Sequence, residues 1–97
     1  MSTAGSSGDA PAYTFVESDT FRDAKGSLPL AARIFDEHLW AIQDMLLDGP
    51  FRWSVEVPGR PGLRLAVSDA TPYSRTAIRV LFRIAGEVIE LLDADLR

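Results

Sequence analysis

One stretch of the sequence decides the fold: IRVLFRIAGEVIELL, residues 78–92. On both sides of Gly86, apolar residues alternate with other residues, a pattern typical of two strands that each bury one face. Ala85-Gly86 is predicted to be a two-residue turn, because glycine supplies the positive φ that such turns need. The stretch therefore predicts an antiparallel hairpin.

Counting back from this turn pairs Phe82 with Ile89, Val80 with Leu91 and Arg79 with Leu92. The predicted inner face, which we expect to pack on helices, holds Ile78, Val80, Phe82, Ile89 and Leu91. The opposite face holds Arg79 and Arg83, with Glu90 diagonal to both. A slip of one residue would bury the two arginines, so the pattern fixes which face is which.

Further strands are predicted before the hairpin. Residues 63–67 and 53–57 both alternate, and a Pro- and Gly-rich break separates them. Residues 69–76 are predicted to form a loop, and residues 13–16 a short first strand. The sheet is therefore expected to be small, curled and antiparallel.

The first half of the chain predicts two helices. Ser18 or Asp19 can cap a short helix that runs to about Lys25, where Gly26 would end it. Ser27 and Pro29 suit the start of a long second helix. Its apolar stripe holds Ala31, Phe35, His38, Ile42 and Met45, and Gly49-Pro50 ends it. We expect an α+β fold in which this N-terminal helical hairpin packs on the sheet.

The 97 residues fit a single domain, predicted over residues 12–97 after a disordered tail at residues 1–11. The chain has no cysteine, which excludes disulfides, thiolate metal ligands and a cysteine nucleophile. No secretory signal and no membrane-spanning apolar stretch are recognisable, so we expect a cytoplasmic protein that does not enter membranes.

Charge is divided unevenly along the chain. Residues 1–50 carry three basic and eight acidic side chains, net −5, whereas residues 51–97 carry seven arginines and six acids, net +1. The overall charge of −4 disfavours non-specific binding of nucleic acid, which depends on neutralising phosphates. A local arginine patch in the second half is compatible with this charge.

The arginines of the second half are the candidate functional residues. Arg64, Arg79 and Arg83 are expected on one face of the sheet, together with Ala66 and Leu81. Arginine binds phosphate bidentately, so such a cluster could grip a nucleic-acid backbone; the alternative is salt bridges from Arg79 and Arg83 to Glu90.

Other side chains offer weaker signals. Tyr73 and Arg75 lie in the 69–76 loop, where the tyrosine could stack on a base or pack over the sheet edge. His38 is the one histidine and is interpreted as a core residue, and we predict no metal site and no cofactor. Trp40 and Trp53 are interpreted as core or interface anchors.

The order of elements resembles the RelE/ParE superfamily of type II toxins. The segments that carry the resemblance are LRLAV at 63–67, IRVLFRI at 78–84, EVIELL at 87–92 and the final arginine. RelE-like members cut messenger RNA on the ribosome without a metal ion, and ParE-like members inhibit DNA gyrase. The resemblance implies catalytic roles for Arg64, Arg79 and Arg97. The arginine face and the loop add Arg83, Tyr73 and Arg75 as candidates for substrate contacts.

The resemblance also implies a cognate antitoxin as partner. Ala66 stands where the family has a further basic residue, and together with the acidic charge this leaves open an inhibitor that is not a ribonuclease. A non-catalytic module that uses the same fold for protein interaction or homodimerisation is the alternative function.

Overall fold

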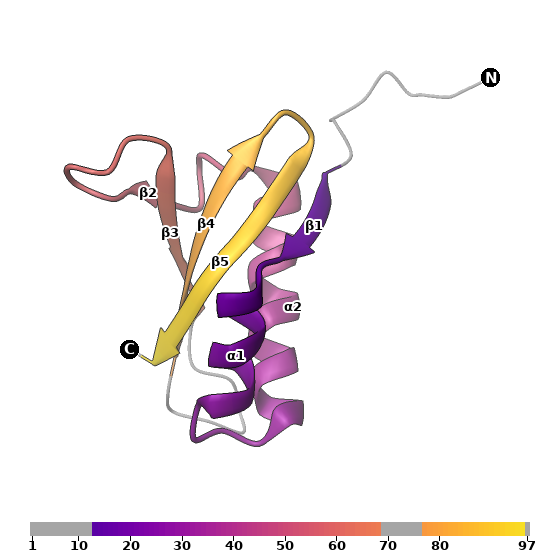
Figure 1. Cartoon of the computed structure of the whole chain (residues 1–97). Coiled ribbons are helices and arrows are strands. Elements are labelled where there is room, and N and C mark those ends of the chain that lie inside the picture. The colour runs from indigo at the N-terminus through magenta and orange to yellow at the C-terminus, as the bar shows by residue number, and fades with distance from the viewer. Residues whose placement is uncertain (1–12, 69–76, 97) are drawn as a thin grey trace.

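The computed structural model describes residues 13–68 and 77–96 and has an α+β architecture (Figure 1). In chain order the elements are β1 (Thr14–Glu17), α1 (Asp19–Ser27), α2 (Ala32–Asp48), β2 (Val55–Glu56), β3 (Leu63–Val67), β4 (Ile78–Ala85) and β5 (Val88–Leu96). The predicted tail at 1–11 and loop at 69–76 lie outside the described residues. No helix in the described part of the chain is both long and apolar enough to cross a membrane.

The five strands form one mixed sheet in the order β1-β5-β4-β3-β2. The pairs β5-β4, β4-β3 and β3-β2 are antiparallel, but β1 runs parallel to β5, so the expectation of a fully antiparallel sheet is wrong. Two helices and three strands separate β1 from β5 in the sequence. Because no tight turn joins the two strands, their relative direction is not restricted to antiparallel.

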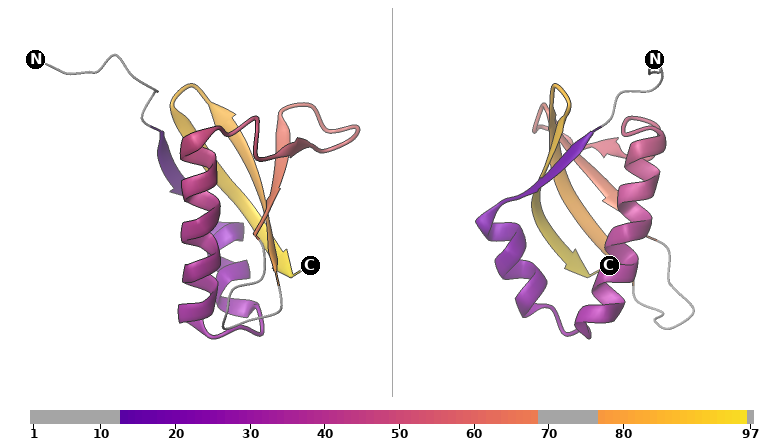
Figure 2. Two further views of the ribbon diagram at one scale, coloured as in Figure 1. Left: turned by 180° about the vertical axis from the view of Figure 1, so that it is seen from behind. Right: turned by 90° about the vertical axis from the view of Figure 1, so that its right-hand side faces the viewer.

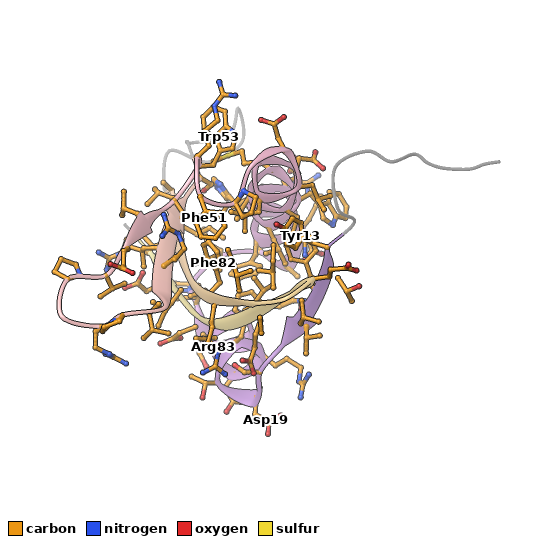
Figure 3. The ribbon with its side chains drawn as sticks, turned by 90° about the horizontal axis from the view of Figure 1, so that it is seen from above. Tyr13, Asp19, Phe51, Trp53, Phe82 and Arg83 are labelled. Atoms are coloured by element: carbon orange, nitrogen blue, oxygen red, sulfur yellow. The ribbon has the colours of Figure 1, made fainter. Side chains whose placement is uncertain are left out.

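Helix α2 lies across one face of this sheet, and the sheet curves around it (Figures 2 and 3). The core lies between them. It combines residues of α1 and α2 with the inward residues of β3, β4 and β5: Phe21, Phe35, Leu39, Ile42, Leu46, Ala66, Ile78, Val80, Phe82, Ile89, Leu91 and Ala94. The predicted inner face of the hairpin is therefore confirmed, since each of its five members is fully buried.

The helix boundaries follow the sequence in part. Ser18 caps α1 through its Oγ, which accepts a hydrogen bond from the backbone N–H of Phe21 (3.0 Å), and Gly49 follows the last residue of α2. Gly26 and Ser27 lie inside α1, so their expected roles as a helix stop and a cap are wrong. The two helices diverge from their connection (Figure 2), so the packed helical hairpin is not confirmed.

The β4–β5 turn is one residue later than predicted. Ala85 pairs with Val88, so Gly86 and Glu87 form the two-residue loop, and Gly86 has a φ of 62°. Between the turn and Phe82, each residue of β4 therefore lies opposite a residue of β5 two positions later than predicted: Phe82 pairs with Leu91 instead of Ile89. Side chains alternate with a period of two, so a shift of two positions brings residues of the same face opposite each other. The buried face is therefore the predicted one although the partners differ.

A β-bulge interrupts the hairpin next to the pair of Phe82 with Leu91, on the side away from the turn. The next pair is Leu81 with Asp93, so Leu92 is the extra residue on β5. Ser18 Oγ donates a hydrogen bond to the carbonyl of Leu92 (2.9 Å), and Asp93 Oδ1 accepts one from the N–H of Ala94 (2.8 Å). Beyond the bulge Ala94 points to the core, and Asp93 and Asp95 are exposed.

Candidate binding groove

The sheet separates the candidate arginines onto its two faces. Residues that pair directly across antiparallel strands share a face. Arg64 pairs with Phe82, which is buried on the α2 side, whereas Arg79 pairs with Val67 on the opposite side. Figure 3 shows Phe82 and Arg83 on opposite sides of the sheet. The expectation that one face carries all three arginines is therefore wrong.

The face away from α2 contains a groove of about 300 Å³ beside Arg79. Residues of four strands and the two residues after β2 line it. Its apolar lining is Val55, Val57, Pro58, Leu65, Leu81 and Ala94, and its polar lining is Glu56, Arg79, Asp93 and Asp95. Leu65 and Leu81 are cross-strand partners and form part of the groove because β3 presents its larger alternating side chains to this face.

Arg79 and Asp95 form a bidentate ion pair at this groove. Arg79 Nε lies 2.8 Å from Asp95 Oδ1, and its Nη2 contacts Oδ2. The hydrogen bond and the negative charge of Asp95 raise the pKa of Arg79 above the ordinary arginine value, so the guanidinium stays charged. The bulge at Leu92 creates this pair: a regular ladder would place Ala94 opposite Arg79 and turn Asp95 toward the core.

Arg83 lies on the same face but does not line the groove. It pairs with Glu90, which is directly opposite on β5. The predicted salt-bridge alternative is thus confirmed for Arg83, while Arg79 uses Asp95 in place of Glu90.

Arg64 fastens the loop that follows α2. Its Nε donates to Ser54 Oγ (2.7 Å), and its Nη2 donates to the carbonyls of Ser54 (3.1 Å) and Phe51 (3.4 Å). The guanidinium also lies 5.0 Å from the centre of the Phe51 ring, within cation–π range. Its donors are directed at this loop, so the geometry gives Arg64 a structural task.

His38 confirms its interpretation as a core residue. It is fully buried, and its Nδ1 shares a hydrogen bond with Ser68 Oγ (2.7 Å), which also accepts from the N–H of Ile78 (3.0 Å). Its Nε2 is buried without a hydrogen-bond partner among residues 13–68 and 77–96. The pair joins α2 to the end of β3 and the start of β4.

The charges around the groove decide its chemistry. Two carboxylates, from Asp93 and Asp95, share this face with one guanidinium, from Arg79, whereas Glu56 lines the groove but pairs across the strands with Arg64 of the opposite face. This local excess of negative charge repels a phosphate backbone, whereas the apolar floor can bury an aliphatic or aromatic side chain. The described residues contain no group of three histidine or acidic side chains that could hold a metal ion. The groove is suited to a protein segment.

Three candidate residues were predicted in addition to Arg64, Arg79 and Arg83. Tyr73, Arg75 and Arg97 lie outside the described residues. The role of Asp95 was missed by sequence reasoning, although Asp93-Ala94-Asp95 contains a usable signal. Regular alternation from the buried residues Ile89 and Leu91 would turn Asp93 and Asp95 toward the core, so only a bulge can keep both carboxylates exposed. No pattern in the sequence marks Val55 and Pro58 as groove residues, because they reach the groove only through the pairing of β2 with β3.

Comparison with known proteins supports the fold. No family model matches the sequence, and no curated protein is significantly similar to it. Among solved structures, a chain of the toxin–antitoxin complex RelBE2 from Mycobacterium tuberculosis superposes with a TM-score of 0.68 at 22% sequence identity. The match covers 89% of this chain and 99% of that chain. The predicted resemblance to RelE-type proteins is therefore confirmed at the level of the fold.

Proposed function

We propose that this chain is the toxin component of a type II toxin–antitoxin pair and that a cognate antitoxin holds it inactive. The fold supports this assignment, because the similarity to a RelBE2 chain extends over nearly the whole of that chain. Fold alone does not fix function, so the target has to be argued from the groove.

The target is a protein, and the groove beside Arg79 is the binding site. The observation that carries this choice is the composition of the groove, where an apolar floor adjoins the carboxylates of Asp93 and Asp95 and a single, already paired, guanidinium. Of the two targets that the family resemblance implies, DNA gyrase fits such a surface better than messenger RNA on the ribosome. Both targets are cytoplasmic, so cytoplasmic action is part of the proposal.

Arg79 and Arg83 provide a matched test of this site. Both are partly exposed arginines of β4, both are paired with a carboxylate of β5, and only Arg79 lines the groove. After induced expression in a sensitive bacterial host, we expect Arg79→Ala to abolish growth arrest and Arg83→Ala to retain it. Co-expression of a small gene adjacent to the toxin gene should restore growth to cells that make the wild-type protein.

Circular dichroism of both purified variants is the control for folding. Arg79 is about 41% exposed in its side chain, so its replacement should leave the fold intact. The site is misplaced if Arg79→Ala unfolds the domain or leaves a toxic wild type fully toxic. The toxin assignment fails if the folded wild-type protein accumulates without harm to the host.

A further inference from the structure

Helix α2 has an outward face that does not belong to the groove. The helix packs on the opposite side of the sheet from Arg83 (Figure 3) and therefore from Arg79, which lies on the same face of β4. The face of α2 that points away from the core carries large apolar side chains. Trp40 is 62% exposed and Leu47 is 42% exposed. They are two helical turns apart, so they lie one above the other along the helix.

Carboxylates flank these two apolar residues on both sides. At 3.6 residues per turn, Asp36 lies on one side of the line from Trp40 to Leu47, and Glu37 and Asp44 lie on the other. Arg33 lies on the same face, one turn before Asp36 and Glu37, so the face carries three carboxylates and one guanidinium. Exposed tryptophan is costly to leave in water and is enriched at the centres of protein interfaces.

This combination specifies the charge of the occupant. A helix of a partner protein could pack alongside α2, with its apolar residues on Trp40 and Leu47 and basic residues opposite the flanking carboxylates, as in the charged positions beside a coiled-coil seam. A second copy of this chain would fit poorly, since a symmetric contact would bring the same carboxylates together.

We propose that the outward face of α2, defined by Asp36, Glu37, Trp40, Asp44 and Leu47, binds a basic amphipathic helix of the antitoxin. This inference rests on the proposed function and names the chemistry of the partner. The two surfaces have no residue in common: the partner's helix contacts α2, and the toxin's target contacts the groove on the far side of the sheet.

The test uses synthetic peptides and the full chain. The probe is a fluorescent helical peptide of about 18 residues, with leucine on one face and lysine on the other, and its twin carries glutamate in place of lysine. Binding is measured by fluorescence anisotropy at low and high salt. In the Trp53→Phe background Trp40 is the sole tryptophan, so its emission reports burial at this face.

We expect the basic peptide to bind, to shift the Trp40 emission to shorter wavelength, and to weaken as salt screens the carboxylates. Trp40→Ala should weaken binding about tenfold. Asp44→Lys should weaken it about fivefold. Asp23→Lys makes the same change in net charge at an exposed position of α1, so it should have little effect on binding.

Three results would overturn the inference: equal binding of the acidic peptide, equal losses from Asp44→Lys and Asp23→Lys, or a dimer of the wild type that Trp40→Ala dissociates. Growth arrest measured in cells that lack the antitoxin tests the proposed function separately from this inference. Asp44→Lys should leave arrest unchanged, because Asp44 does not line the groove.

Discussion

Replacing Ser68 with alanine tests how the fold holds α2 against the sheet. Ser68 is 1% exposed, and its Oγ accepts a hydrogen bond from the N–H of Ile78 and bonds to His38 Nδ1. Alanine would leave both groups buried without a partner. Each such group costs about 1–3 kcal/mol, so we expect Ser68→Ala to lower the free energy of unfolding by about 3 kcal/mol.

The assay is equilibrium urea unfolding followed by far-ultraviolet circular dichroism. Ser27→Ala is the matched control, because the Ser27 hydroxyl also makes a hydrogen bond, which it donates to the carbonyl of Asp23, but at the exposed surface of α1. We expect Ser27→Ala to change the free energy of unfolding by at most about 0.5 kcal/mol.

A second background isolates the contribution of the histidine. In His38→Leu the imidazole is gone, so Ser68→Ala then orphans only the Ile78 N–H. The serine substitution should cost about 1–2 kcal/mol less there than in the wild type. The reasoning is refuted if Ser68→Ala costs under about 0.5 kcal/mol, or if it costs the same in both backgrounds.

Four more changes follow from local geometry; the first three are measured by the same urea unfolding and the last by limited proteolysis. Ser18→Ala removes the cap of α1 and the bond to the bulge carbonyl, and should cost about 2 kcal/mol; a loss no larger than that of Ser27→Ala contradicts the capping role. Gly86→Ala should destabilise by about 1 kcal/mol because its φ is positive, while Gly26→Ala, inside α1, should stabilise by about 0.5–1 kcal/mol; matching signs would contradict this. Arg64→Ala should free the 51–54 loop and raise its proteolytic cleavage rate, and a wild-type cleavage pattern would count against the fastening role.

Strand periodicity predicts the faces of β4 and β5 well and their partners poorly. The alternation over residues 78–92 identifies Val80, Phe82 and Ile89 as core residues, and all three are fully buried. The same alternation does not show where the turn begins. If the turn moves by one residue, each cross-strand partner changes by two positions, and every side chain stays on the same face. Ala85-Gly86 and Gly86-Glu87 both offer glycine for the positive φ.

Nonlocal contacts explain the remaining differences. On β3, Leu65 faces the groove, whereas Ala66 and Ser68 face α2. The strand pattern alone suggests the reverse, since large apolar residues usually face the core. Here α2 brings His38 against the small residues, and this packing is invisible in the β3 sequence. The parallel pairing of β1 with β5 depends on distant segments in the same way.

Part of the candidate site could be found from the sequence. Arg79 was identified correctly as an outward residue of β4, because the buried alternation leaves its position no other face. Its ion pair was misassigned to Glu90, because the bulge at Leu92 moves Asp95 into place. The separation of Arg64 from Arg79 depends on the register of β3 against β4, which the hydrophobic pattern does not set.

The central claim is that the groove beside Arg79 binds a protein target. Genome-wide mapping of RNA 5′ ends, performed minutes after induction of the wild type and of Arg79→Ala, tests it most directly. Our account predicts that the wild type arrests growth without creating new 5′ ends in messenger RNA, and that Arg79→Ala grows normally. New cleavage sites within translated messages that disappear in Arg79→Ala would contradict the account, because Arg79 would then act on RNA.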